Sequence, residues 1–287
     1  MLRFRTLALL LALHFAALAA GPANDFRFSI LGDRTGTPDQ KIYAQAWAEI
    51  NRLRPDFVIN VGDTIEGGAD ETAQAEWRTI RGFLNQYRRF PFYYVAGNHD
   101  VWSAYSRKLF EKETGRPTFY SFNFQNAHFV VLDNSQTLDL ALNQLQFLER
   151  DLQQNRQRSP KFVFFHQSFW MVFLKFQSGA FPLHRLAREY GVSYVVTGHG
   201  HFLFRMAREG VNYVQAGSSG AKVRPSFADG AFYHHLLVQV KGSQIRVTVK
   251  ELDPPYGNGR SFNLEDWEGS KPKFNPDSLP SSRGPSR

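Results

Sequence analysis

The 287-residue sequence predicts an α/β fold, and two features of its apolar pattern support this prediction. Short apolar runs that end at Gly, Asp or Asn alternate with longer amphipathic runs, as parallel strands alternate with the helices that cover them. After Gly198 the apolar runs follow one another with short connections, which is typical of antiparallel strands. The composition is that of a packed globular protein, with 43% hydrophobic and 21% charged residues. The 27 phenylalanines predict an aromatic core.

The predicted strands are short and rich in β-branched and aromatic residues. They cover residues 26–31, 57–61, 92–96, 129–132, 162–165 and 194–196, and then 211–215, 232–240 and 244–251. The predicted helices carry apolar residues at helical spacing and few breakers, and they cover 40–53, 71–87, 104–113, 138–155 and 183–190. Gly242 and Ser243 would form the hairpin turn between the last two strands.

The first residues have the layout of a secretory signal peptide. Arg3 and Arg5 precede an apolar run, and Ala17-Leu18-Ala19 provides the small residues of a cleavage site. We therefore expect residues 1–19 to be a signal peptide and the protein to be exported, either periplasmic or secreted. An uncleaved membrane anchor is the alternative. No later stretch is long enough to span a bilayer, so no transmembrane segment is expected in the mature chain.

A single domain is expected over residues 20–252, followed by a tail. Residues 253–287 are rich in Pro, Gly, Ser and Asn, so we expect this tail to be partly disordered, above all in its last dozen residues. A few apolar residues would attach part of it to the surface of the domain: Phe262, Leu264, Trp267 and Phe274.

Composition also excludes several kinds of function. The chain has no cysteine, so it has no disulfide scaffold, cysteine nucleophile or thiolate metal site. Its formal charge is +8, of which Arg3 and Arg5 belong to the expected signal peptide. A basic surface favours anionic partners. The positive charge is spread out, however, and no basic stripe interleaved with aromatic residues gives a clear signature of nucleic-acid binding.

Polar motifs follow five of the predicted strands. Loops at the carboxyl ends of parallel strands share one crevice, so these motifs are expected to meet. Carboxylate, amide and imidazole groups together are ligands for Mn²⁺, Fe or Zn²⁺, and six such ligands are enough for two ions. The five motifs are Gly32-Asp33-Arg34-Thr35-Gly36, Gly62-Asp63-Thr64-Ile65-Glu66, Gly97-Asn98-His99-Asp100, His166 and Gly198-His199-Gly200-His201.

This ordered series resembles the calcineurin-like metallophosphoesterase superfamily. Its motifs run Asp-x-His, Gly-Asp-x-x, Gly-Asn-His-Asp/Glu, a lone His and Gly-His-x-His. The resemblance covers residues 26–250, and the combination of Gly-Asn-His-Asp with a later Gly-His-Gly-His is its most specific part. It implies a four-layer α/β/β/α sandwich with two mixed sheets. It also implies two divalent metal ions (Mn, Fe or Zn) and a phosphoester substrate.

The resemblance implies a role for each motif residue. Asp63 would bridge the two metals. His99 would stand near the leaving-group oxygen without binding metal, and Asp100 would orient it, which makes these two the candidate catalytic residues. The remaining ligands divide into two sets: Asn98, His166 and His199 at one metal position, and Asp33 and His201 at the other.

The first motif departs from the common pattern. Thr35 stands where many members carry a ligand His, which leaves the Asp33 metal position one ligand short. The purple acid phosphatase branch also lacks this His and uses a Tyr three residues after the bridging Asp, a spacing that Glu66 has here. Our hypothesis is that Glu66, or a water held by Thr35, compensates. Arg34 is a candidate for contact with the substrate phosphate.

The expected function is metal-assisted hydrolysis of phosphate monoesters or diesters outside the cytoplasm. Two cations roughly 3.5–4 Å apart would lower the pKa of a bridging water and polarise the phosphoryl oxygens. Two alternatives remain open. One is a nuclease or nucleotide-processing esterase with the same site, and the other is a metal- or phosphate-binding protein with a degenerate, non-catalytic site.

Other polar and aromatic residues have structural explanations beside functional ones. We expect His128, His184, His234 and His235 to be structural. An aromatic stretch after His166 is either a wall at the mouth of the site or core packing, and Lys222 and Arg224 lie in a Gly/Ser-rich segment that is expected to be a surface loop. The aromatic stretch consists of Phe169, Trp170, Phe173, Phe176 and Phe181.

Overall fold

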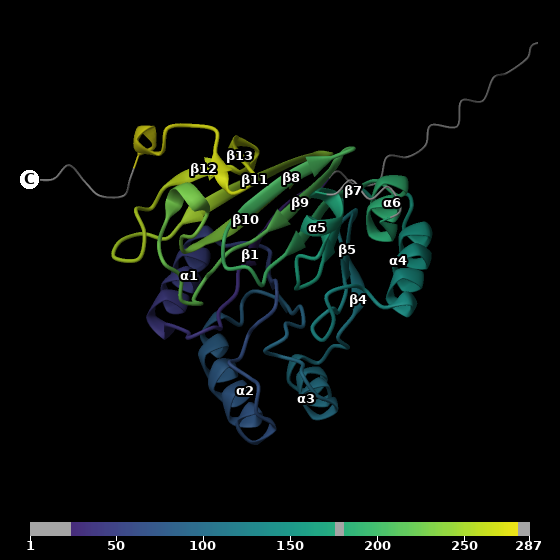
Figure 1. Cartoon of the computed structure of the whole chain (residues 1–287), viewed down its shortest axis with the longest axis horizontal. Coiled ribbons are helices and arrows are strands. Elements are labelled where there is room, and N and C mark those ends of the chain that lie inside the picture. The colour runs from purple at the N-terminus through teal and green to yellow at the C-terminus, as the bar shows by residue number, and fades with distance from the viewer. Residues whose placement is uncertain (1–23, 176–180, 281–287) are drawn as a thin grey trace, which may run out of the picture.

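The computed structural model describes residues 24–175 and 181–280, which form two six-stranded sheets with helices on their outer faces (Figure 1). The first sheet has the order β12-β11-β10-β1-β2-β3, and the second has the order β4-β5-β6-β7-β9-β8. The strands of the first sheet are β1 (Asp25–Leu31), β2 (Phe57–Asn60), β3 (Phe92–Tyr93), β10 (His234–Lys241), β11 (Gln244–Glu251) and β12 (Ser261–Asn263). Those of the second are β4 (Tyr120–Phe124), β5 (Ala127–Val131), β6 (Lys161–Phe164), β7 (Val192–Thr197), β8 (Phe204–Arg208) and β9 (Val211–Gln215).

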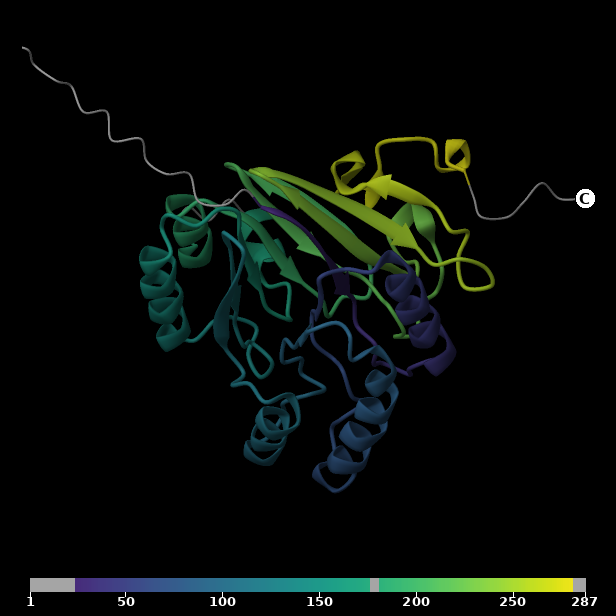
Figure 2. The same cartoon turned by 180° about the vertical axis from the view of Figure 1, so that it is seen from behind.

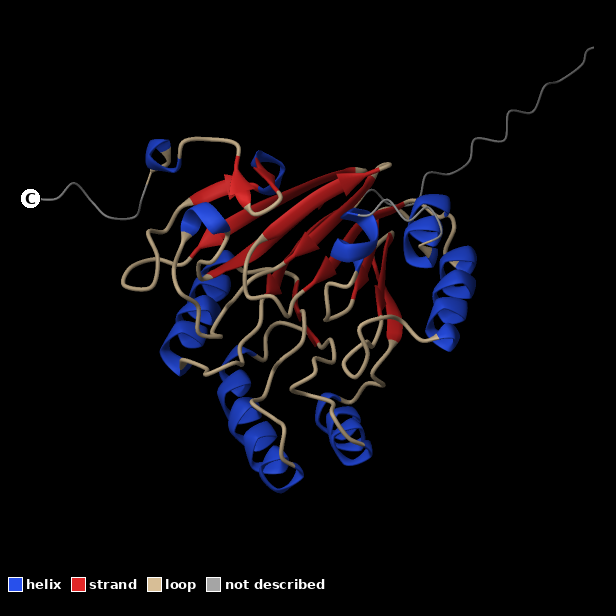
Figure 3. Ribbon diagram, in the orientation of Figure 1, coloured by secondary structure: helices blue, strands red, loops and turns tan. Residues whose placement is uncertain are grey.

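Helices cover both outer faces, which gives the four layers α/β/β/α that the resemblance implied (Figure 3). The first sheet packs against α1 (Gln40–Leu53), α2 (Asp70–Leu84) and α3 (Ala104–Thr114). The second sheet packs against α4 (Leu142–Gln154), α5 (Trp170–Lys175) and α6 (Pro182–Glu189). Within the described ranges, no helix is both long and apolar enough to cross a lipid bilayer.

Phenylalanine rings fill the space between the two sheets. The rings of Phe28 and Phe57 stack with centroids 4.8 Å apart, and those of Phe129 and Phe162 stack at 5.0 Å. The two stacks meet edge to face, since Phe28 and Phe129 are 5.4 Å apart with an interplanar angle of 86°. Such offset and edge contacts are the favourable geometries of aromatic pairs. The high phenylalanine content is thus explained by a rigid core that fixes one sheet against the other.

Strand direction brings the five motifs to one edge of the sandwich. In the first sheet β1, β2 and β3 run parallel, and in the second β5, β6, β7 and β9 run parallel. The carboxyl ends of these strands therefore open on the same side of the molecule, with loops that run toward α2 and α3 (Figures 1 and 2). The motif residues lie in the loops after β1, β2, β3, β6 and β7.

The segment after residue 252, which the sequence predicts to be a tail, takes part in the core. Strand β12 pairs with β11, and Phe262, Leu264 and Trp267 are buried between the sheets. The indole Nε1–H of Trp267 donates a hydrogen bond to the carbonyl of Leu203 at 3.3 Å. A short hairpin of β13 (Trp267–Glu268) and β14 (Lys271–Pro272) follows. The expected signal peptide and residues 281–287 lie outside the described residues.

Two helix boundaries differ from the predicted ones. Helix α4 begins at Leu142 rather than at residue 138, because side chains just before it bond to the local backbone. Thr137 donates to the Asp139 carbonyl at 2.7 Å, and the Asp139 carboxylate accepts the Leu140 N–H at 2.7 Å. Such local bonds compete with helix formation. Helix α2 ends at Leu84, and a 3₁₀ turn continues to Tyr87.

Candidate metal centre

Asp33 is held by the backbone of a glycine- and serine-rich loop. Its N–H donates to the Gly217 carbonyl at 3.1 Å, and its carbonyl accepts N–H groups from Ser219 and Ala221 at 3.0 and 3.2 Å. The side chain is fully buried. Within the described part of the chain, neither oxygen of its carboxylate has a hydrogen-bond partner. A buried carboxylate without partners is costly, so this group is poised for a ligand.

Four donor atoms converge beside Asp33. The Oδ1 atom of Asn98 lies 2.9 Å from His166 Nε2 and 2.9 Å from His199 Nδ1. His166 Nε2 is also 3.2 Å from His199 Nδ1 and 3.3 Å from Asp63 Oδ1. Ligands about 2.1 Å from a common ion are about 3.0–3.4 Å from one another, so this spacing fits a metal position.

Asp33 and His201 lie next to this cluster. Asp33 Oδ1 is 3.6 Å from His166 Nδ1, and Asp33 Oδ2 is 3.9 Å from His201 Nε2. The structure therefore brings all six predicted ligands to one place, with Asp63 and His166 at its centre. The second group of donors is sparser than the first, as expected for a chain with Thr35 in place of a histidine.

Three of the predicted ligands have left-handed backbone conformations. The φ angles are 57° at Asp63, 71° at His199 and 57° at His201. Residues other than glycine adopt this region rarely, and each costs of the order of 1–3 kcal/mol. Three such residues in one pocket indicate that the surrounding structure enforces these conformations to aim the side chains, a pattern that is typical of functional sites.

Two motif glycines are required because carboxylates approach their backbones. A Cβ atom on Gly97 would lie 2.1 Å from Asp63 Oδ1, and one on Gly198 would lie 2.6 Å from Asp33 Oδ1. Any larger residue would displace these carboxylates. The glycines of the third and fifth motifs thus make room for the predicted metal ligands.

Hydrogen bonds to the backbone orient His166. Its Nδ1–H donates to the carbonyl of Val61 at 2.8 Å, which turns Nε2 toward Asn98 and Asp63. The buried Asn134 side chain accepts the N–H groups of His166 and Gln167 at 3.1 and 2.9 Å. Our sequence reasoning missed this role of Asn134, although its position in a polar run directly after a predicted strand was a usable signal.

Burial and charge set the protonation of the cluster. Burial raises the pKa of Asp33 well above its ordinary value, opposed by His166 and reinforced by Asp63. Burial alone would lower the pKa of His166, but the negative charges of Asp63 and Asp33 outweigh burial and raise this pKa to about 10. Burial lowers the pKa values of His199 and His201, so both favour the neutral form that binds metals. A bound cation would replace the proton that His166 shares with its acidic neighbours.

His99 is oriented by Glu66 rather than by Asp100. The Nδ1–H of His99 donates to the main-chain carbonyl of Glu66, and the His99 N–H donates to Asp63 Oδ1 at 3.0 Å. The buried carboxylate of Asp100 instead accepts three backbone N–H groups, from Thr64 at 2.8 Å and from Ile65 and Gly97 at 3.1 and 3.0 Å. Asp100 thus fixes the loops that carry Asp63 and Asn98. Burial, with Asp63 nearby, raises the pKa of Asp100 to about 7.

Thr35 and Glu66 contact each other directly. The Thr35 hydroxyl donates to Glu66 Oε2, and the same carboxylate accepts the N–H groups of Gly36 and Thr37 at 3.4 Å each. Partial burial raises the pKa of Glu66, but the hydrogen bonds from Thr35 and these N–H groups outweigh it and lower the pKa. The two residues that our hypothesis singled out therefore form one unit beside Asp33.

Arg34, a candidate for contact with the substrate phosphate, bonds elsewhere. Its guanidinium donates to the Thr64 carbonyl at 3.0 Å and to Gln40 at 3.2 Å, and it lies over the ring of Tyr43. These contacts tie the first motif to the second motif and to α1. Both terminal nitrogens of the guanidinium are thus bound by protein groups, so the structure favours a structural role for Arg34, although its buried Nε has no hydrogen-bond partner among the described residues.

The other histidines of the sequence analysis lie near protein groups away from the metal centre. His128 lies 2.6 Å from Asp151, His184 lies 2.8 Å from the Tyr213 hydroxyl, and His235 lies 3.7 Å from Glu49. Lys222 and Arg224 are exposed, as expected of a surface loop.

The aromatic stretch after His166 is mainly core. Phe169, Trp170 and Phe181 are buried against the helices that cover the second sheet, and Phe173 packs on Phe181 with ring centroids 4.8 Å apart. Of the two readings of this stretch, the described residues favour core packing over a wall at the mouth of the site. Phe176 lies outside the described residues.

More than half of the chain matches the model of a known protein family. The model of the calcineurin-like phosphoesterases matches residues 30–203, which contain all five motifs. The chain belongs to this family. Its members are usually hydrolases with binuclear metal centres. No curated protein sequence matches the chain at a significant level.

Solved structures of this fold are similar to the chain. A purple acid phosphatase from yellow lupin (Lupinus luteus) seeds has a TM-score of 0.60 at 13% identity and covers 88% of this chain, which spans only 53% of the lupin chain. GAP50, described as the anchor in the inner membrane complex of Plasmodium, has a TM-score of 0.57 at 15% identity, covering 87% of this chain and 90% of its own. At such low identity these structures support the fold alone.

Proposed function

We propose that this protein hydrolyses phosphate monoesters or diesters with the help of two divalent cations. The buried carboxylate of Asp33, which has no hydrogen-bond partner within the described residues, is the main support. It lies beside a set of oxygen and imidazole donors, and such a set suits Mn²⁺, Fe or Zn²⁺. When bound, two divalent cations supply Lewis acidity and a water of lowered pKa. One position would be held by Asp63, Asn98, His166 and His199, and the other by Asp33, Asp63 and His201.

His99 is our candidate for protonating the leaving group. Its Nδ1–H is used by the Glu66 carbonyl, so Nε2 is the ring atom left to face a substrate. A proton on Nε2 would pass to the oxygen of the departing alcohol as the P–O bond breaks. The bond from the His99 N–H to Asp63 keeps this ring at a fixed place relative to the metal centre.

The Thr35–Glu66 pair supports a second candidate function. Thr35 stands where many members carry a ligand histidine, and its hydroxyl is donated to Glu66, so the Asp33 position has one side-chain ligand fewer. A protein with one strong and one weak position could bind a metal or a phosphoryl group without turnover. The similarity to GAP50, which is described as an anchor, is compatible with a family member that serves another purpose.

Turnover and metal content together test the proposal. The full chain would be assayed with Mn²⁺ on para-nitrophenyl phosphate, its bis-ester and single-stranded DNA, beside the Asp63→Asn variant. We expect ester turnover that needs Mn²⁺ and two metals per chain in the wild type, with both lost in Asp63→Asn. Metal binding without turnover of any ester would favour the non-catalytic candidate, and turnover of DNA alone would favour a nuclease.

We also propose that the protein is exported and acts outside the cytoplasm, on the basis of the signal-like residues 1–19. The measurement is the N-terminal residue of the protein recovered from a periplasmic or culture fraction. A chain that begins after Ala19 in that fraction is expected, and full-length protein confined to the cytoplasm would contradict export.

A further inference from the structure

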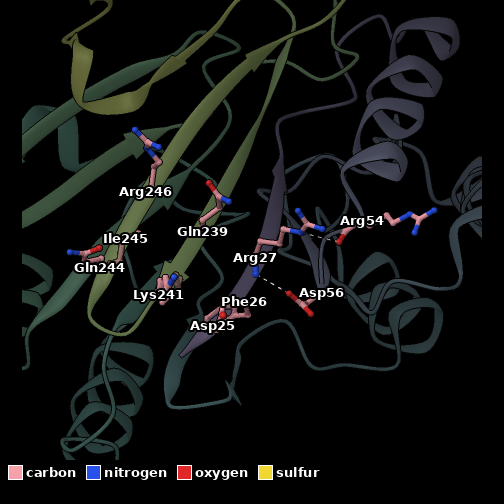
Figure 4. A pocket seen from close by; sticks show the side chains of 11 residues that line it. Asp25, Phe26, Arg27, Arg54, Asp56, Gln239, Lys241, Gln244, Ile245 and Arg246 are labelled. Carbon is pink, nitrogen blue, oxygen red and sulfur yellow. Dashed lines mark hydrogen bonds between the residues drawn. The ribbon is translucent and has the colours of Figure 1, made fainter. Parts of the chain in front are cut away.

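A hollow lies at the end of the first sheet that is opposite the metal centre. It has a volume of about 860 Å³ and is formed by β1, β10, β11 and the loop after α1 (Figure 4). It begins at Asp25, eight residues before Asp33, so the strand rise of about 3.3 Å per residue puts the two sites roughly 25 Å apart. The hollow is therefore separate from the metal centre.

Four cationic side chains line this hollow: Arg27, Arg54, Lys241 and Arg246. Within residues 24–175 and 181–280, none of them forms an ion pair with a carboxylate. Many other arginines of the chain are paired, among them Arg107 with Asp133, Arg205 with Glu268 and Arg260 with Glu251. The hollow thus concentrates positive charge that the protein does not neutralise.

The strands hold part of this charge in a fixed row. Arg27 is directly opposite Gln239 in the pairing of β1 with β10, and Gln239 is opposite Arg246 in the pairing of β10 with β11. Figure 4 shows Gln239 between Arg27 and Arg246 across the three strands, with the Arg27 guanidinium turned toward Arg54. Neighbouring strands are about 4.8 Å apart, so the two arginine backbones are about 10 Å apart. The Nε–H of Arg27 donates to the Arg54 carbonyl at 3.2 Å and that of Arg246 to Asn263 Oδ1 at 3.1 Å, so each guanidinium has its other N–H groups left for an oxyanion.

Two carboxylates also line the hollow, but they leave an excess of positive charge. Asp56 Oδ2 accepts the backbone N–H of Arg27 at 2.8 Å, which fixes this carboxylate at the edge beside β1. Asp25 is at the start of the same strand. Four cations and two carboxylates leave two positive charges for a ligand.

The lining indicates the chemistry of the ligand. A single phosphate would occupy a small part of this volume. Aromatic bases bind protein surfaces by stacking on exposed rings, and the one aromatic residue of the lining, Phe26, is only 4% exposed. We propose that this hollow binds an anion with two or more phosphoryl groups, recognised by its charges and not by a base. Free oligophosphate and the headgroup of cardiolipin, a phospholipid with two phosphodiester groups, share this chemistry.

Binding of tripolyphosphate to the full chain tests the proposal. Calorimetry in EDTA keeps the metal centre from contributing. We expect one tripolyphosphate per chain, at least tenfold weaker binding of single phosphate, and no tighter binding of adenosine triphosphate. In the triple variant Arg27→Gln, Lys241→Gln, Arg246→Gln the affinity for tripolyphosphate should fall at least tenfold, and turnover at the metal centre should be unchanged.

A matched variant controls for net charge. Arg78, Lys108 and Arg150 are exposed on α2, α3 and α4, so their replacement by Gln removes the same charge elsewhere. This control should keep wild-type affinity within twofold. An equal loss in both triple variants, or no binding of tripolyphosphate and phospholipid by the wild type, would overturn the proposal.

A vesicle arm distinguishes the two sources of phosphoryl groups. Wild type and the triple variant of the hollow (Arg27→Gln, Lys241→Gln, Arg246→Gln) would be mixed with cardiolipin vesicles and with phosphatidylcholine vesicles. If these anionic vesicles bind the wild type but not the triple variant, and if tripolyphosphate binds weakly, the lipid headgroup is the source of the phosphoryl groups. Tight tripolyphosphate binding with no difference between the vesicles would identify a free oligophosphate.

Discussion

His166 Nδ1 is hydrogen-bonded to the carbonyl oxygen of Val61 at 2.8 Å, although the two residues belong to different sheets. Val61 follows β2, and His166 follows β6. A carbonyl oxygen can only accept, so this bond fixes which ring nitrogen carries the hydrogen and leaves Nε2 for the donor cluster. The same bond joins the two sheets at the edge where the motifs meet.

Gly62 makes the approach of His166 possible and gives a first prediction. A Cβ atom there would lie 2.5 Å from His166 Nδ1, and φ is +103°. We expect Gly62→Ala to displace His166 and to lower metal affinity at least tenfold, measured by metal titration. Gly68→Ala is the matched control, because φ is +83° but no atom lies within 4 Å of the added Cβ. It should cost about 1–2 kcal/mol of stability and leave metal affinity unchanged.

Replacement of His99 should separate catalysis from metal binding. In His99→Gln we expect kcat to fall by about 10²–10⁴ for esters with poor leaving groups, because a proton donor is lost. The loss should be smaller for para-nitrophenyl esters, whose leaving group needs less protonation. Metal content, measured by elemental analysis, should stay at the wild-type value. A variant that loses its metals would place His99 among the ligands instead.

Removal of the Glu66 carboxylate tests whether the Thr35–Glu66 pair supports the second metal position. We expect Glu66→Ala to bind fewer metal ions per chain than the wild type, because Thr35 and the N–H groups of Gly36 and Thr37 lose their common acceptor. The exposed Glu71 on α2 provides a control of equal charge, Glu71→Ala. Two-metal occupancy in both variants would argue against a role for Glu66.

The buried His234 gives a prediction on pH. Its Nδ1–H donates to the Phe232 carbonyl at 2.8 Å, and its Nε2 accepts the Gly217 N–H at 3.2 Å. Burial lowers the pKa of His234 to about 4. In the unfolded chain the pKa is near 6.5, so between these values the unfolded state binds more protons and folding loses stability as pH falls.

The size of this loss is on the order of 3 kcal/mol in the free energy of unfolding between pH 6.5 and 4. Urea unfolding at a series of pH values would measure it in the wild type and in His234→Gln. The variant should have a flatter dependence over this window, whatever its stability at pH 7. Parallel curves for the two proteins would contradict the prediction.

The α/β class and the meeting point of the motifs could be predicted from local pattern, whereas the four layers were implied by the family resemblance. Strand periodicity sets the order of elements, and parallel direction places Asp33, Asp63 and His166 at one edge. The central strands of each sheet were therefore easier to predict than the strands at the sheet edges. Strand β4, for example, alternates Tyr120-Ser121-Phe122-Asn123-Phe124 and, among the described strands, pairs with β5 alone, and we did not anticipate it.

Side-chain direction was harder to predict, because it depends on partners that are distant in sequence. Asp100 is adjacent to His99, yet three N–H groups from two loops hold its carboxylate. Arg34 is drawn to Thr64 and Gln40 by hydrogen bonds that no spacing rule shows. The burial of Trp267 could not be predicted from a segment rich in turn-forming residues. It depends on a distant loop, where the carbonyl of Leu203 accepts a hydrogen bond from the indole.

The hydrogen bond from Trp267 to Leu203 limits how far the chain can be shortened from its C-terminal end. The family match ends at residue 203, but five of the twelve strands of the two sheets, β8 to β12, follow it. Strand β10 is the neighbour of β1, and β9 is the neighbour of β7. A fragment that ends at residue 203 would expose the hydrogen-bonding edges of β1 and β7, and such unpaired edges promote aggregation. Expression of the region that carries the five motifs therefore needs the chain at least as far as Trp267, whose indole is hydrogen-bonded to Leu203.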